Sequence, residues 1–82
     1  MIMTITEIKT EVNNIFCRVL NNPSLKLTDT TTAPDVEGWD SLSNIVLISE
    51  VEKHFNIKFK LREILKLKNV GDLHNSILKK IS

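Results

Sequence analysis

The residues that could carry chemistry gather at Gly38-Trp39-Asp40-Ser41-Leu42, where a long loop meets a predicted helix. Asp40 is a good N-cap, because its carboxylate accepts hydrogen bonds from the first backbone N–H groups and complements the helix dipole. Ser41 is then the first helical residue, with its hydroxyl beside solvent. A phosphodiester on that hydroxyl would be favoured by the dipole and by free backbone N–H groups. Asp-Ser at a helix start is also common for structural reasons alone, so the pair does not by itself establish a site.

Other kinds of active site are excluded by the residue inventory. Two histidines and one cysteine are too few for a usual zinc site, and two glycines cannot form a phosphate-binding loop. A triad of Ser41, His54 and Asp40 fails, because His54 lies more than three helical turns from Ser41. Helical periodicity predicts that His54 lies on the surface and His74 at the core edge of the last helix. Cys17 is predicted to be exposed, opposite the apolar stripe of the first helix.

Apolar residues that recur every three or four positions predict a chain of helices. These cover residues 5–20, 40–55, 61–67 and 69–81. Thr4 and Glu7 form a capping-box pattern at the first start, and Asn56 is a plausible left-handed stop for the second helix. The inward stripe of the second helix is predicted to contain Ile45, Ile48, Val51 and Phe55, with Leu47 beside them. In the short third helix, Ile64 and Leu65 are predicted to face inward.

A long loop over residues 21–40 separates the first two helices and lacks sustained periodicity. Loops of this length in a compact domain are often functional, and Leu25, Leu27 and Val36 are expected to pin this one to the core. Residues 57–61 alternate like a strand, but a lone strand would have nothing to pair with. The prediction is therefore an all-α four-helix bundle, with residues 1–82 forming a single domain.

Composition indicates a soluble globular chain of 82 residues, with 41% hydrophobic and 26% charged residues and a net charge of +1. The longest apolar run, residues 45–48, is far too short to cross a bilayer, and no secretory signal opens the chain. One cysteine and no export signal favour a reducing cytoplasm. The last third is basic but has no aromatic residue after Phe59 and one Arg, so neither nucleic acid nor a membrane is expected as a partner.

The motif and the second helix together resemble the acyl carrier protein family. The residues that carry the likeness are Gly-Trp-Asp-Ser-Leu followed by Ile45, Leu47, Ile48, Val51, Glu52 and Phe55. The resemblance covers nearly the whole chain and implies a bundle of acyl-carrier type that is not itself an enzyme. It also implies that Ser41 carries 4′-phosphopantetheine, with Asp40 and Leu42 beside it, and that the thiol of this arm holds acyl groups as thioesters.

The resemblance implies partners, and the sequence departs from the family on the face that would meet them. A phosphopantetheinyl transferase would load the arm, and an acyl- or aminoacyl-ligase or synthase would charge it. Typical carriers of fatty-acid synthesis present carboxylates on the second helix, whereas this helix presents apolar, hydroxyl and basic side chains. Candidate recognition residues are Val46, Ser43, Ser49 and Glu37. With Trp39 just before the motif, the sequence is similar to many stand-alone carriers outside primary fatty-acid synthesis. This resemblance implies a specialised fatty-acid or polyketide-type pathway, and it implies a monomeric protein.

The cargo is left open by the sequence. In acyl carriers the helices shelter an acyl chain, and candidate lining residues here are Leu47, Ile48, Val51, Leu65 and Ile77. A peptidyl or aminoacyl carrier would share the fold and the arm but keep its cargo outside. An unmodified helical interaction module is the alternative from a different class.

Overall fold

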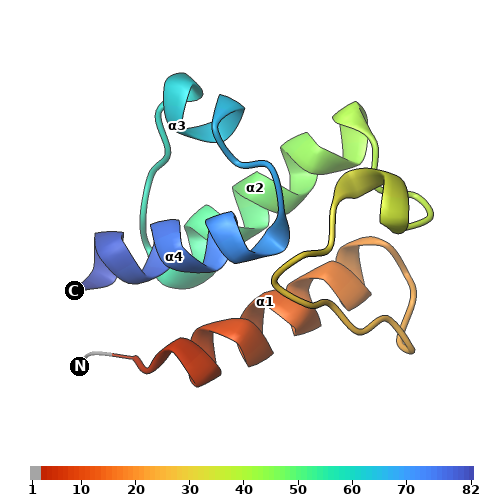
Figure 1. Cartoon of the computed structure of the whole chain (residues 1–82), viewed down its shortest axis with the longest axis horizontal. Helices are drawn as coiled ribbons and strands as arrows, with labels where there is room; N and C mark the ends of the chain where they lie inside the picture. Colours follow the sequence, from red (N-terminus) through yellow and green to blue (C-terminus); the bar gives the residue numbers. More distant parts are fainter. Residues whose placement is uncertain (1–2) are drawn as a thin grey trace.

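The computed structural model describes residues 3–82 and contains only helical elements and loops within that range (Figure 1). The elements are α1 (Ile5–Val19), the 3₁₀ turn η1 (Ala33–Asp35), α2 (Ser41–Phe55), α3 (Leu61–Leu65) and α4 (Val70–Ile81). Helix α1 packs against both α2 and α4, which run back antiparallel to it, and α3 lies on the far side of them from α1 (Figure 1). The all-α prediction is confirmed, including the absence of a strand at residues 57–61.

The ends of the main helices follow the capping signals in the sequence. The Thr4 backbone N–H donates to Glu7 Oε1 at 2.9 Å, and the Glu7 N–H donates to Thr4 Oγ1 at 3.2 Å, so the predicted capping box forms. Asp40 caps α2, and Asn56 ends it in the left-handed conformation with a φ of 56°. Local chemistry therefore sets these boundaries within one residue of the prediction.

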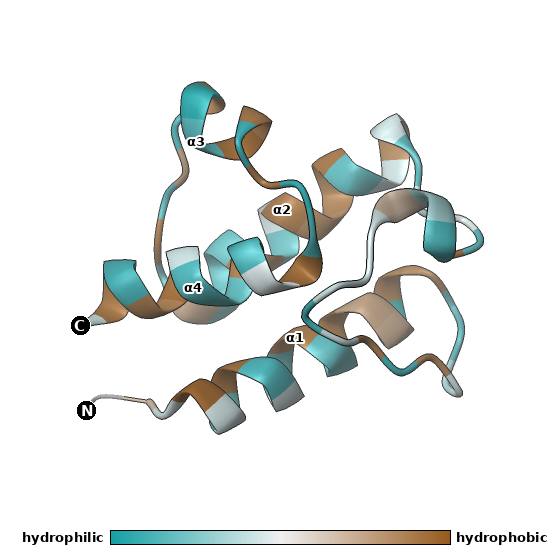
Figure 2. Ribbon diagram, in the orientation of Figure 1, coloured by the Kyte–Doolittle hydropathy of each residue, from teal (hydrophilic) through white to brown (hydrophobic). Residues whose placement is uncertain are grey.

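The core is formed by three helices. Its buried side chains are Ile8, Val12, Ile15 and Phe16 of α1, Leu47, Ile48, Val51 and Phe55 of α2, and Leu73 and Ile77 of α4. Figure 2 shows these helices with hydrophobic and hydrophilic stretches alternating along each ribbon, as amphipathic helices require. Burying each of these side chains contributes about 1.5–3 kcal/mol. Helix α3 contributes no fully buried residue, so the fold is held together by α1, α2 and α4.

The long loop is fastened to α1 by Asn13. The Asn13 side-chain amide donates to the Leu25 carbonyl at 3.0 Å and accepts from the Leu27 N–H at 2.8 Å. Leu25 and Leu27 pack against the core, and Val36 is buried. The predicted pinning of the loop by these three apolar residues is confirmed, and Asn13 adds a polar tie that periodicity alone does not reveal.

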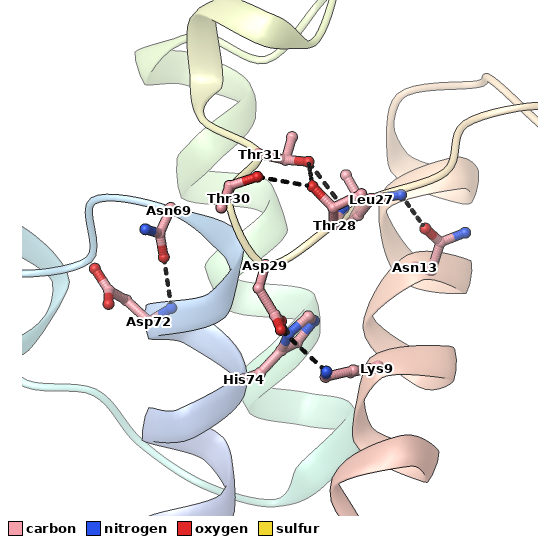
Figure 3. Close-up of polar contacts among 10 residues, drawn as sticks. All are labelled: Lys9, Asn13, Leu27, Thr28, Asp29, Thr30, Thr31, Asn69, Asp72 and His74. Atoms are coloured by element: carbon pink, nitrogen blue, oxygen red, sulfur yellow. Dashed lines mark hydrogen bonds and ion pairs between the residues drawn. The ribbon is translucent and has the colours of Figure 1, made fainter.

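A second fastening, which we call the Asp29 clasp, joins Lys9, Asp29 and His74 (Figure 3). His74 Nδ1 lies 2.9 Å from Asp29 Oδ1, and Lys9 Nζ lies 3.1 Å from Asp29 Oδ2. The hydrogen bond from His74, followed by that from Lys9, holds the pKa of Asp29 below its ordinary value. The Gly71 N–H donates to the Asp29 carbonyl at 2.8 Å, and a Cβ on Gly71 would lie 2.8 Å from the same oxygen. The clasp thus holds the loop against both α1 and α4.

Several sequence-based positions are corrected by the structure. His74 is 3% exposed, buried under the loop rather than at the core edge. Cys17 is partly buried rather than exposed, because the loop folds back so that the thiol lies 3.4 Å from the Leu25 carbonyl oxygen. Ile45 and Leu65 are exposed, because no element within residues 3–82 covers the outer face of α2 or that side of α3. The third helix ends at Leu65, two residues earlier than predicted.

Candidate functional site

Ser41 is the first residue of α2 and is exposed to solvent. Its hydroxyl makes no hydrogen bond with any residue in the described range 3–82. Asp40 Oδ1 accepts from the Leu42 N–H at 3.0 Å and from the Ser43 N–H at 2.9 Å. The bond from the Ser43 backbone is the main cause that lowers the pKa of Asp40, so this carboxylate is ionised at neutral pH. The predicted capping of α2 by Asp40 is therefore confirmed, and it occupies two of the first backbone N–H groups.

The turn before Ser41 is fixed by Ser43 and Gly38. The Asp40 N–H donates to Ser43 Oγ at 2.8 Å, and the Ser43 hydroxyl donates to the Gly38 carbonyl at 2.7 Å. Gly38 has a φ of +87°, which an L side chain rarely adopts. The Ser43 hydroxyl is thus engaged within the chain, where it holds the loop that leads into α2.

Trp39 anchors the same turn to the core. Its ring meets the Phe16 ring edge-on, with the centroids 4.9 Å apart and the planes at 89°. Its indole Nε1–H donates to Asn44 Oδ1 at 3.0 Å. These contacts on both sides of Asp40 and Ser41 place the hydroxyl of Ser41 on a rigid corner rather than on a mobile loop.

A cavity of about 290 Å³ opens beside Ser41, between α2 and the α3 segment. Its lining is mostly apolar and comprises Phe16, Ala33, Trp39, Asp40, Ser41, Asn44, Leu47, Ile48, Ile64, Leu67, Lys68, Asn69 and Leu73. Of the five expected lining residues, Leu47 and Ile48 contribute to this cavity. Val51 and Ile77 instead fill the core, and Leu65 points outward. An exposed hydroxyl at the mouth of an apolar cavity fits the attachment of a long, flexible arm to Ser41.

The candidate recognition residues are only partly presented to solvent. Val46 and Glu37 are exposed, Ser49 is half-buried, and the Ser43 hydroxyl is engaged as described above. Leu42, also exposed, lies on the same outer face of α2 as Val46. Asn44, Ile64 and Leu67 also line the cavity, although the sequence pattern did not predict them there. The position of Asn44, three residues after Ser41, was the available signal for one of them.

Other chemistry finds no support in the part of the chain that the structure describes. His54 pairs with Glu11 at 3.2 Å rather than approaching Ser41, and its surface position is confirmed. Within residues 3–82, no group of three or more His, Cys, Asp or Glu side chains is placed to hold a metal ion. No helix in the same range is long and apolar enough to cross a membrane.

Comparison with known proteins identifies the family. The phosphopantetheine attachment site family matches residues 10–77. The chain is 36% identical over 63 residues to an acyl carrier protein of Brachyspira hyodysenteriae, covering 76% of this chain and 81% of that protein. It is 32% identical over 78 residues to an acyl carrier protein of Chloroherpeton thalassium, covering 95% and 98% of the two chains.

A solved structure extends the likeness to the fold. The solution structure of a holo acyl carrier protein from Geobacter metallireducens matches with a TM-score of 0.85 and 45% identity, covering 89% of this chain and 84% of that one. The matched region includes Asp40, Ser41 and the cavity beside them. The chain therefore belongs to the acyl carrier protein family, as a phosphopantetheine-bearing carrier protein and not an enzyme.

Proposed function

We propose that the chain is a free-standing, monomeric and cytoplasmic carrier of one domain over residues 1–82, with 4′-phosphopantetheine on Ser41. The observation that carries the proposal is the placement of Ser41, whose unengaged hydroxyl stands on a rigid corner at the mouth of an apolar cavity. Ser43 is the next hydroxyl along α2, but it is engaged by Gly38 and Asp40. Asp40 and Leu42 flank the proposed attachment point.

Loading Ser41 is a phosphoryl transfer that this chain does not catalyse alone. The Ser41 oxygen forms a bond to the β-phosphorus of coenzyme A, the pyrophosphate bond breaks, and adenosine 3′,5′-bisphosphate leaves. The serine proton needs an acceptor, and no side chain among residues 3–82 accepts a hydrogen bond from Ser41. A phosphopantetheinyl transferase supplies that base in the proposal. The bound group then contributes a thiol that holds the cargo as a thioester.

The cavity favours an acyl cargo over an aminoacyl one. Its walls near Ser41 are formed by Phe16, Leu47, Ile48 and Ile64, which offer an apolar chain a place out of water. A polar aminoacyl group would gain nothing from such walls. A ligase or synthase of a specialised biosynthetic pathway is the proposed charging partner, with Val46, Glu37, Ser49 and Ser43 as candidate recognition positions.

The proposal is tested by measuring intact mass before and after incubation with coenzyme A and a broad-specificity phosphopantetheinyl transferase. We expect the wild-type chain to gain one phosphopantetheine and the Ser41→Ala variant to gain none. Ser24→Ala is the matched control, since Ser24 is another exposed serine whose hydroxyl has no hydrogen bond among the described residues, and it should load normally. Absence of loading with several transferases, or loading of Ser41→Ala, would overturn the proposal.

A further inference from the structure

Every large apolar side chain that is exposed in residues 3–82 belongs to α2 or α3. These residues, which we call the α2–α3 apolar face, are Leu42, Ile45, Val46, Leu61 and Leu65, with exposed fractions from 49% to 76%. Figure 2 shows hydrophobic segments on both helices next to hydrophilic ones on α3. Single exposed apolar residues are ordinary, but a group of five confined to two neighbouring helices indicates an interaction surface.

The contacts of α3 place its two leucines on the side of the helix opposite to Glu63. Ile64 faces the cavity that α2 also lines, and Glu63 is tied to α4 by an ion pair with Lys80 at 2.8 Å. At about 100° per residue, Leu61 and Leu65 lie on the opposite side of Ile64 from Glu63. They therefore lie on the side of α3 turned away from its ion pair with α4, and both are exposed.

The exposed residues of α2 continue that surface up to the attachment point. Ile45 lies four residues after Ser41 and three before Ile48, and both of these residues line the cavity. Leu42 and Val46 follow on the outer side of Ile45. The apolar face thus runs along the cavity beside Ser41, where an enzyme acting on the arm must approach.

The two glutamates of α2 are engaged by other residues of the chain. Glu50 pairs with Arg18 at 3.1 Å and with Lys53 at 3.6 Å. Glu52 accepts the Phe59 N–H at 2.8 Å. Asp40 caps the helix through two backbone hydrogen bonds and keeps its negative charge. Near Ser41, the exposed carboxylates Asp35 and Glu37 form no ion pair within the described range.

The free charges beside α3 are positive. Arg62, Lys66 and Lys68 are exposed, and none of them forms an ion pair with the residues that the structure describes. Lys68 also lines the cavity mouth. Glu63, the carboxylate of α3, is neutralised by Lys80. The apolar face is therefore bordered by unpaired cations on its α3 side.

We propose that the α2–α3 apolar face docks a carrier-dependent enzyme whose own docking surface is an apolar patch bordered by carboxylates. This inference rests on the proposed function, because it assigns the chemistry of the partner that reaches the arm on Ser41. Burial of apolar side chains supplies the affinity, and complementary charge steers the encounter and fixes its register.

Two matched helical peptides test the chemistry of the proposed partner. Both carry the same leucine face, one bordered by glutamates and the other by lysines. We expect the glutamate peptide to bind the full-length protein at least about tenfold more tightly at low salt, a difference of about 1.4 kcal/mol. In the NMR spectrum of the protein, the amide shifts that the glutamate peptide causes should centre on residues 42–46 and 61–66. The preference for the glutamate peptide over the lysine peptide should weaken as salt is added.

Charge-reversal variants separate this face from general charge effects. Arg62→Glu combined with Lys66→Glu should abolish or reverse the preference, since both side chains are exposed and border the face. Lys79→Glu is the matched control, because Lys79 is exposed on α4 and pairs with no described residue; it should leave the preference intact. Leu61→Ser with Leu65→Ser should remove binding of both peptides without unfolding the chain.

Three outcomes would overturn the proposal. The first is equal or tighter binding of the lysine peptide, or no shift from either peptide. The second is binding of phosphatidylglycerol vesicles through the same residues without binding of the glutamate peptide, which would make the face a membrane contact. The third is peptide binding by a chain that no transferase loads with phosphopantetheine on Ser41. That result would remove the reason for assigning the face to a carrier-dependent enzyme. Peptide binding does not require the phosphopantetheine arm. If the chain is loaded on Ser41 but does not bind the peptides as predicted, this inference fails and the proposed function stands.

Discussion

Two sides of this small bundle both carry apolar residues, but they differ in what covers them. On one side, α1, α2 and α4 pack together, and Leu47 of α2 is 1% exposed. On the other, the outer faces of α2 and α3 carry exposed apolar side chains, and Leu42 is 76% exposed. The packed side is covered by neighbouring helices and the open side is not. Apolar residues on one helix can thus serve the fold on one face and recognition on the other.

Polar contacts are distributed in the same way. On the packed side they join separate elements, as in the Asp29 clasp, the Asn13 ties and the pair between Arg18 and Glu50. Around Ser41 they join residues within one turn, where Asp40 and Ser43 fix the start of α2. The first group holds the bundle closed, and the second holds one hydroxyl at its corner.

The largest expected effect comes from truncating the two leucines of α2 that represent the two sides. Leu47→Ala should lower the free energy of unfolding by about 2–5 kcal/mol, because it leaves a void in the core. Leu42→Ala should change it by less than about 0.5 kcal/mol, because the side chain is already in water. Urea titration of both variants provides the measurement. Equal losses of unfolding free energy in the two variants would contradict the distinction between a packed side and an open side.

A smaller effect is expected where the two sides meet, at Ile48. Ile48→Phe fills part of the cavity and should cost about 1–3 kcal/mol of stability by overpacking. In the loaded protein, a long acyl chain should raise the melting temperature of the wild type more than a short one, and this difference should shrink in the variant. Leu65→Phe, on the exposed surface, is the control. An unchanged chain-length dependence in Ile48→Phe would argue that the cargo stays outside.

The smallest effect concerns the Asp29 clasp and its pH dependence. Because the pKa of Asp29 is lowered in the folded state, its stabilising contribution is complete above about pH 4 and is lost as pH falls through the lower folded value. Asp29→Asn should therefore be less stable than the wild type at neutral pH, with the difference fading below about pH 4.

The control for the clasp is Glu37→Gln, at an exposed carboxylate with no hydrogen bond in the described range. At neutral pH it should be about as stable as the wild type, because it breaks no hydrogen bond of the described residues. Chemical denaturation of the three proteins across a pH series would check this. A difference between Asp29→Asn and the wild type that stays constant down to strongly acidic pH would contradict the role of the ionised clasp.

The sequence was sufficient where the determining chemistry is local. The capping residues Thr4, Asp40 and Asn56 set helix ends through neighbours within a few positions, and the resemblance around Ser41 indicated the carrier fold. Ile45 was misplaced because apolar residues surround most of α2, so periodicity alone could not say which of them a neighbour covers. The Asp29 clasp joins residues 45 positions apart, and no local pattern encodes that contact.

The cavity depends on the same long-range information. Its walls come from α1, α2, the α3 segment and the start of α4, so its members share no spacing in the sequence. Val51 and Ile77 were expected there as apolar residues of the right helices. Whether such a residue lines a cavity or fills the core is decided by how the helices pack, which the sequence pattern leaves open.

The most direct test of the account locates the added phosphopantetheine on the loaded wild-type chain. Trypsin should release residues 27–53, a peptide that contains three candidate hydroxyls of α2 in Ser41, Ser43 and Ser49. Fragmentation mass spectrometry of this peptide distinguishes them. We predict that the added mass lies wholly on Ser41, the hydroxyl at the open corner. Mass on Ser43, on Ser49 or outside this peptide would contradict the assignment of the site.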